Sequence, residues 1–198
     1  MLETSDKQIL EFLQKQEMQS ILLCLPPHPS VDALCAGLAM RACVEKMGKR
    51  VLLVSENFVV PSRLKFLPIA DRVSGTAPAI NTMTIAVDVS KTKADNISYE
   101  TLGDKLLIYL TPHNGTFIAQ DVATKAGFAF DMIITIGSSD LETLGSLFLD
   151  RADFFHHTPI INIDHAAGNE QYGQVNHVNV TATSTSEVVA RFMFDTLP

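Results

Sequence analysis

The chain has 198 residues, of which 46% are hydrophobic and 19% are charged, and its formal net charge is −7. This composition is typical of one well-packed globular domain and excludes a disordered or fibrous protein. The acidic balance argues against tight binding of long nucleic acid, which needs a broad Lys and Arg surface. No apolar run approaches the roughly 20 residues of a membrane helix, so we expect no membrane span.

The first third of the chain predicts a helix and then a strand, a helix and a strand. A capping-box pattern opens the first helix, and a proline-rich loop separates the first strand from the second helix, which stops at Gly48. Together residues 21–55 form a right-handed βαβ unit. The predicted elements are the helix opened by Ser5–Gln8, strand 21–25, helix 31–47 and strand 50–55.

The middle of the chain is less regular. Residues 84–89 and 105–110 have strand character, and we expect them to pair as neighbours, with the polar residues 91–103 as a solvated connection. His177 is expected in an exposed loop. The remaining predicted elements are a short helix at 119–126, a buried strand at 131–136, a helix at 141–150, a strand at 160–163 and a helix opened by the capping box Ser184–Glu187.

The three cysteines, Cys24, Cys35 and Cys43, show no paired spacing. An odd number of cysteines on one strand and the following helix favours small buried side chains over a disulfide framework. Residues 1–16 carry charged and amide side chains throughout and lack the apolar stretch of a secretory signal. We therefore expect a reducing, cytoplasmic location.

Two strand ends carry candidate functional groups. A short run of β-branched residues stops at Asp164-His165, which predicts a buried parallel strand with two ligand-capable side chains at its carboxyl end. The loop at 26–32 precedes a helix start, where backbone N–H groups and carboxylates can face a phosphate or a metal. Taken alone, Asp32 is more often a helix N-cap than a ligand.

These segments resemble the DHH phosphoesterases. In that family a strand "NIDHH" is followed by a small-residue turn, an Asn, "FG" and another Asn, and here residues 162–176 are NIDHAAGNEQYGQVN. Asp32-Ala33-Leu34 and Met47–Val51 match the tail of the family's first motif. The resemblance runs from about Ile21 to Leu197. It implies the family's N-terminal catalytic domain, an α/β fold with a parallel sheet of about five strands and helices on both faces.

The resemblance also implies a domain organisation and a set of site residues. Residues 1–198 would be a single domain with an insertion at 80–118 and without the family's C-terminal substrate-binding domain. Asp32, Asp164 and His165 would be catalytic, with Asp32 and His165 as metal ligands. Four other ligand positions are replaced, by Pro26, Ser30, Gly137 and Ala166. Implied substrate-binding residues are Ser30, Ser138, Ser139 and Asn169, and further candidate metal ligands are His28, Asp88 and Asp140.

The implied function is that of a phosphoesterase-like domain for nucleotides or short oligonucleotides, catalytically impaired or inactive. One alternative is an active hydrolase using Mn²⁺ or Mg²⁺ at a relocated site built from His28, Asp32, Asp88, Asp140 and His165. The other is a noncatalytic nucleotide-sensing or protein-interaction domain without a metal. A homodimer is a further expectation. If the alignment holds, Pro26, Gly137 and Asp164 follow neighbouring strands, with Asp32 and Asp164 within about 15 Å.

Overall fold

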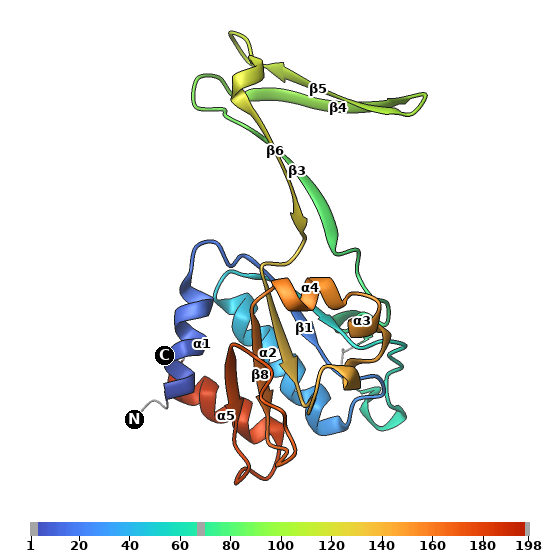
Figure 1. The fold of residues 1–198 in the computed structure, drawn as a ribbon, viewed down its shortest axis with the longest axis vertical. Coiled ribbons are helices and arrows are strands. Elements are labelled where there is room, and N and C mark those ends of the chain that lie inside the picture. The colour runs from blue at the N-terminus through green and yellow to red at the C-terminus, as the bar shows by residue number, and fades with distance from the viewer. Residues whose placement is uncertain (1–3, 67–69, 197–198) are drawn as a thin grey trace. The chain divides into compact units, whose positions relative to one another are not determined.

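Figure 1 shows the computed structural model, which describes residues 4–66 and 70–196. The chain forms two compact units: the first comprises Met1–Ile80 and Phe128–Pro198, and the second Asn81–Gly127. The segment predicted as an insertion, 80–118, overlaps the second unit. The predicted end of the resemblance, Leu197, and the predicted domain limits 1 and 198 lie outside the described residues.

The first unit is built on a five-stranded parallel sheet. Its strands run in the order β2-β1-β7-β8-β9, and β1, β7 and β8 are buried along their whole length. Strands covered on both faces are continuous apolar runs, which is why these segments could be recognised in the sequence. The strands are β1 (Ser20–Cys24), β2 (Arg50–Val54), β7 (Met132–Ile136), β8 (Ile160–Asp164) and β9 (Val175–Val178).

Helices cover both faces of this sheet. Alternate residues of β1 enter two different hydrophobic cores, Ile21 and Leu23 on one face and Leu22 and Cys24 on the other. The first core includes side chains of α1 (Thr4–Gln14), α2 (Val31–Lys46) and α5 (Thr185–Thr196), and the second those of α3 (Ser146–Leu149) and α4 (Ala152–His157). The predicted α/β class, with about five parallel strands between two layers of helices, is confirmed.

Two local predictions in this unit are wrong. The helix predicted at 141–150 is broken into the 3-10 turn η4 (Glu142–Leu144) and α3, because Gly145 between them adopts φ +66° and ends the first turn. His177 does not lie in an exposed loop. It is buried in β9, where Nδ1 lies 2.7 Å from Ser5 Oγ and Nε2 lies 3.5 Å from Asp6 Oδ1.

The second unit consists of two two-stranded ribbons. Strand β3 (Asn81–Val87) pairs with β6 (Val122–Phe128), and β4 (Ala94–Leu102) pairs antiparallel with β5 (Lys105–Pro112). The turn between β4 and β5 is the two-residue loop Gly103-Asp104, with φ +59° at the glycine. The described residues also include the 3-10 turns η1 (Ser62–Leu64) and η2 (Ala70–Arg72) in the first unit and η3 (Ala119–Asp121) in the second.

The predictions for this unit are wrong in three respects. Residues 84–89 and 105–110 do not pair with each other, the expected solvated connection at 91–103 contains β4, and the helix expected at 119–126 is η3 followed by β6. Polar residues alternate with apolar ones along β4, so composition alone suggested a loop. In the part of the chain that the structure describes, no helix has the length and apolar character needed to cross a bilayer.

Candidate functional site

Three loops leave the sheet at the same edge. Strands β1, β7 and β8 are adjacent and parallel, so the segments that follow Cys24, Ile136 and Asp164 all start at the carboxyl edge. In open α/β sheets this edge carries the ligand sites. The expectation that the strand ends near Pro26, Gly137 and Asp164 lie side by side is therefore confirmed.

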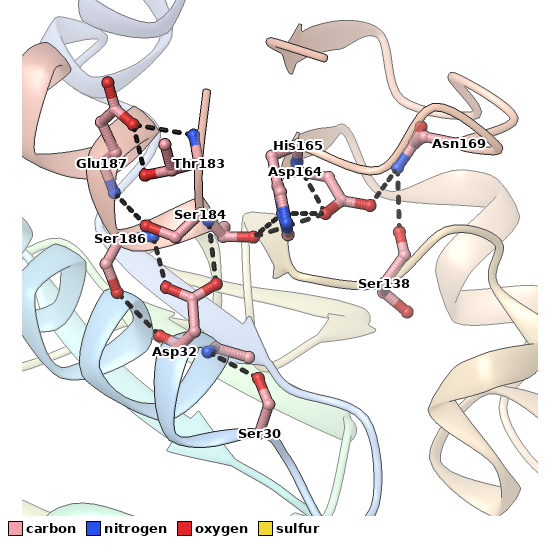
Figure 2. A network of polar contacts seen from close by, with 12 residues as sticks. Ser30, Asp32, Ser138, Asp164, His165, Asn169, Thr183, Ser184, Ser186 and Glu187 are labelled. Atoms are coloured by element: carbon pink, nitrogen blue, oxygen red, sulfur yellow. Dashed lines mark hydrogen bonds and ion pairs between the residues drawn. The ribbon is translucent and has the colours of Figure 1, made fainter. Parts of the chain in front are cut away.

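Asp32 caps a helix far away in the sequence. It lies in the first turn of α2, but its Oδ2 accepts a hydrogen bond from Thr185 N at 2.9 Å and its Oδ1 one from Ser186 N at 2.8 Å (Figure 2). The Ser186 hydroxyl donates to the Asp32 carbonyl at 2.9 Å. These contacts place the carboxylate on the amides that open α5, where a negative charge is favourable.

The electrostatics of Asp32 agree with this role. Partial burial by itself raises the pKa of Asp32, but hydrogen bonds from Ser186 and Thr185 and the nearby His165 outweigh it. The net effect is that the pKa of this carboxyl lies below its ordinary value. Asp32 is consequently ionised while it caps α5, and the helix α2 that carries it is capped by another residue, Ser30.

Asp164 and His165 are joined to Asp32 through Thr185. Asp164 is buried, and its Oδ1 accepts hydrogen bonds from His165 N at 2.7 Å and from Thr185 Oγ1 at 3.4 Å, while its Oδ2 accepts one from Asn169 Nδ2 at 2.9 Å. The Nδ1 atom of His165 lies 2.9 Å from Thr185 Oγ1. Both carboxylates thus contact one threonine, so Asp32 and Asp164 are well within the expected distance.

Thr185 is the residue that sequence reasoning missed. It was recognised only as part of a capping box, and that box is formed in modified form: Ser184 Oγ accepts from Glu187 N at 3.1 Å, while the Glu187 carboxylate accepts from Thr183 N at 2.8 Å. One feature of the sequence could have indicated Thr185: it directly follows Ser184, the predicted N-cap of the last helix, and the start of that helix lies beside two strand ends.

An amide network supports the loop after β8. Asn162 Nδ2 donates to Asn169 Oδ1 at 2.6 Å and to Asn176 Oδ1 at 3.1 Å. Asn169 Nδ2 also reaches the Ser138 carbonyl at 3.1 Å, and Asn176 Nδ2 donates to the Gly173 carbonyl at 2.7 Å. These side chains connect β8, β9 and the loop after β7, so Asn169 positions Asp164 within a fixed scaffold.

Gly137 stands where the resemblance implies a missing carboxylate. Its φ is +64°, and a Cβ added there would lie 3.0 Å from Ala33 Cβ. A side chain at this position is therefore both strained and crowded. Restoring an aspartate here would need a shift of the start of α2 or of the loop.

The residues after Gly137 form a turn that engages its own side chains. Ser138 is buried and its hydroxyl contacts the Asp140 carbonyl and Thr143 Oγ1. Ser139 Oγ donates to Asp140 Oδ2 at 2.9 Å, and Asp140 Oδ1 accepts from Thr143 N at 2.7 Å. Asp140 thus caps η4, and this turn holds the predicted ligand Asp140 and the predicted substrate-binding residues Ser138 and Ser139.

The other predicted site residues lie in local turns. Ser30 Oγ accepts from Ala33 N at 3.0 Å and so is the N-cap of α2. His28 is exposed in the loop before it, with φ +52°. Asp88 belongs to the second unit, where its carboxylate accepts from Ser90 N at 2.8 Å, and this hydrogen bond is the largest cause of its lowered pKa. The structure therefore brings together Asp32, Asp164, His165 and Asn169.

These residues do not fit a two-metal centre. Among residues 4–66 and 70–196, no group of three or more His, Cys, Asp or Glu side chains is placed to hold a metal ion. Both oxygens of Asp32 accept helix amides, and Asp164 is buried among three donors. Two cations about 3.5 to 4 Å apart need several carboxylate and imidazole ligands facing one space.

The hydroxyl of Tyr172 should contribute to the stability of this scaffold. Its hydroxyl lies 2.7 Å from Thr135 Oγ1 and 3.0 Å from the Ser138 carbonyl, and burial raises its pKa, so the phenol stays protonated. Tyr172→Phe should lower the free energy of unfolding by about 1 kcal/mol, measured by urea titration, because it removes a donor from buried acceptors. Tyr109→Phe removes an exposed hydroxyl bonded to Glu100 and should change stability by less than about 0.5 kcal/mol. Equal losses in the two variants would contradict the prediction.

No protein-family model matches the sequence, and no curated protein does. A solved structure of an exopolyphosphatase-related protein from Bacteroides fragilis matches 98% of this chain with a TM-score of 0.58 and 13% sequence identity. The chain spans 44% of the length of that protein. At this identity the likeness shows the fold alone: the chain has the α/β fold of an exopolyphosphatase-related protein.

Proposed function

We propose that the chain is a phosphoesterase-like domain that binds a nucleotide or a short oligonucleotide without hydrolysing it. The ligand class is supported by the resemblance to DHH phosphoesterases and by the fold of an exopolyphosphatase-related protein. The observation that carries the loss of hydrolysis is the use of Asp32, whose two carboxylate oxygens accept the first amides of α5.

The two carboxylates of the site, those of Asp32 and Asp164, make structural contacts in this arrangement. Metal-dependent hydrolysis of a phosphoester requires ligands that hold cations against the attacking and leaving oxygens. Here Asp32 caps a helix, and Asp164 orients the backbone of His165 and the amide of Asn169. Proline, serine, glycine and alanine occupy the other ligand positions that the resemblance implies. A binding site that kept its scaffold and lost its cations accounts for this pattern.

His165 is the residue through which we expect a ligand to bind. Its side chain is 37% exposed, and Nδ1 faces Thr185 and Asp164 at 2.9 and 3.6 Å. With Nδ1 held in this way, Nε2 lies on the other side of the ring, where it can donate to a phosphate oxygen when it carries a proton. The orientation is fixed in advance, which favours binding because little side-chain freedom is lost.

The proposal is tested by binding and hydrolysis assays on the same protein. Calorimetric titration with 5′-phosphorylated diadenylate should show binding that His165→Ala weakens by at least about tenfold, the loss of one charge-assisted hydrogen bond. His28→Ala, which removes an exposed histidine of a neighbouring loop, should leave the affinity unchanged. Incubation with manganese should release no mononucleotide.

Other outcomes would contradict the proposal in distinguishable ways. Manganese-dependent release of mononucleotide that is abolished by Asp32→Asn would identify an active hydrolase. If diadenylate does not bind, or if His165→Ala leaves its affinity unchanged, there is no nucleotide site at His165, and the noncatalytic protein-interaction alternative is favoured.

A further inference from the structure

The second unit has no hydrophobic core of its own. Within residues 81–127, all of which the structure describes, no hydrophobic side chain is buried, and Thr92 is the single buried residue. Eleven of the sixteen large hydrophobic side chains that are exposed among the described residues lie in this segment. Two-stranded ribbons are marginally stable in water without a layer packed on them. The unit therefore needs a partner surface.

The β4–β5 ribbon presents one continuous apolar face. In its antiparallel register Ile97 lies opposite Leu110, Tyr99 opposite Ile108, and Thr101 opposite Leu106. Residues directly opposite one another project from the same face. We name this set the apolar ribbon face; its large side chains are Ile97, Tyr99, Leu106, Ile108 and Leu110, and Tyr99 at its centre is 76% exposed.

The opposite face of the ribbon is more polar, because it carries the two charged side chains of the paired residues, Glu100 and Lys105, beside Leu102, Leu107 and Tyr109. Ser98 pairs with Tyr109, Glu100 with Leu107 and Leu102 with Lys105, and the Tyr109 hydroxyl donates to Glu100 Oε1 at 2.6 Å. An antiparallel sheet with one apolar and one polar face is the pattern of a sheet that packs on one side and meets water on the other. The ribbon thus has one face to cover.

The charges of the unit favour a second copy of this chain as the covering layer. Residues 81–127 contain four lysines and five acidic residues, so all but one of the −7 formal charges lie outside this segment. Two acidic chains can approach through a nearly neutral surface with less repulsion than through any average part of the molecule. An isologous contact also places an apolar ribbon face against an identical one.

The exposed apolar area of the ribbon face is comparable to the non-polar share of a stable dimer interface. Four of the exposed hydrophobic side chains lie on the apolar ribbon face, Ile97, Tyr99, Leu106 and Ile108; they are 43% to 76% exposed, which corresponds to on the order of 100 Å² each. A specific interface buries about 800 Å² on each partner. More than half of such an interface is non-polar, and two sheets packed face to face about 10 Å apart would cover these four side chains.

We propose that residues 81–127 form a dimerisation arm, in which the apolar ribbon faces of two copies pack on each other. The contact supplies the second layer that each ribbon lacks. It gives the expected homodimer a defined surface, and it does not depend on the nucleotide site of the first unit.

The test compares two lysine substitutions on opposite faces of the ribbon. Sedimentation velocity over a roughly hundredfold concentration range should show that the 198-residue chain is a dimer that dissociates on dilution. Tyr99→Lys should raise the dimer dissociation constant roughly thirtyfold or more, the loss expected for a central aromatic anchor. Leu102→Lys, on the other face and 67% exposed, should leave it within about threefold. Both side chains are exposed in one chain and lie outside the first unit, so neither change should affect the folding of the first unit; circular dichroism checks this.

Hydrogen exchange on the wild-type protein gives a second measurement that needs no variant. Amides of β4 and β5 should be protected at dimer concentrations and exchange faster on dilution. A protein that is monomeric throughout the range would overturn the proposal, whether or not its ribbon amides are protected. A dimer that is equally sensitive to both substitutions, or to neither, would also overturn it, because the contact would then lie elsewhere.

Discussion

Replacement of Gly173 by alanine is expected to lower the free energy of unfolding by about 3 kcal/mol or more. A Cβ at this position would lie 2.8 Å from the Val175 carbonyl oxygen, 2.9 Å from the Ile160 carbonyl oxygen and 3.1 Å from Asn162 N. All three are backbone atoms at or beside the β8–β9 pairing, so none can move without distorting the sheet. For a chain of this length, the midpoint of thermal unfolding should be roughly 6 to 12 °C lower than in the wild type.

Gly168 provides the matched control. It lies in the same connection between β8 and β9, and a Cβ there would meet nothing within 4 Å. Gly168→Ala should therefore be neutral or slightly stabilising, since alanine restricts the unfolded chain. A Gly173→Ala protein that unfolds within about 1 kcal/mol of the wild type would show that β8 and β9 are not held in the described register.

This comparison bears on what the resemblance to DHH phosphoesterases can mean. Gly173 is one of the residues that match the family's motif, and so are Asn162, Asn169 and Asn176. In the structure each of these residues supports strand pairing or orients a neighbour through amide hydrogen bonds. Matches at residues that serve packing indicate a fold, whereas four of the ligand positions that the resemblance implies hold Pro26, Ser30, Gly137 and Ala166.

The fold of the first unit was predictable because burial leaves a simple pattern. Strands β7 and β8 are buried throughout, and they were found as apolar runs of β-branched residues. Strand β9 was missed because Asn176 and His177 interrupt the apolar pattern; the His177 ring contacts Ser5, and Asn176 Oδ1 accepts from Asn162, both in other segments of the chain. Such partners cannot be read from a local window.

The second unit could not be predicted for a different reason. Its strands contain Thr, Asn, Ser and Glu beside their apolar residues, and no core selects one face along the chain. Local propensity for a strand is weak when burial does not reinforce it. If a second copy covers the dimerisation arm, contacts between the two chains stabilise its structure, and such contacts cannot be predicted from a single sequence.

For the candidate site, the sequence allowed the positions to be predicted better than the roles. Asp164 and His165 lie at the end of β8 as expected, and Asp32 lies in the first turn of α2. The role of Asp32 depends on Thr185 and Ser186, which are more than 150 positions away in the sequence. The capping pattern at the start of α5 predicts contacts only among neighbouring residues, so it gave no indication of Asp32. A carboxylate that caps a remote helix has the same local sequence as one that binds a metal.

The function of Asp32 leads to the last prediction. Asp32→Asn should lower the free energy of unfolding by about 1 to 2 kcal/mol near neutral pH, because it removes the negative charge and one of two acceptors at the start of α5. Asp195→Asn changes an exposed carboxylate at the other end of the same helix and should alter stability by less than about 0.5 kcal/mol. Urea titrations of the three proteins measure both effects.

The pH dependence of the stability difference between wild type and Asp32→Asn shows whether the Asp32 carboxylate stabilises the fold as a helix cap. The pKa of Asp32 is lower in the folded protein than its ordinary value of 3.8, so the folded state favours the ionised form. Its stabilisation is then complete above that value and is lost as the pH falls through the lower folded pKa. The gap between wild type and Asp32→Asn should stay constant from neutral pH down to about pH 5 and close at more acid pH.

The wild type and Asp32→Asn also test the alternative role of Asp32 as a metal ligand. A cap depends on the amides of α5 and is indifferent to divalent cations, so manganese should leave the difference between wild type and Asp32→Asn unchanged. A cation bound by the folded wild type alone would raise its unfolding temperature in proportion to the logarithm of the manganese concentration. That result, together with a wild type and variant of equal stability without manganese, would assign Asp32 to a metal and would reverse the proposal that hydrolysis has been lost.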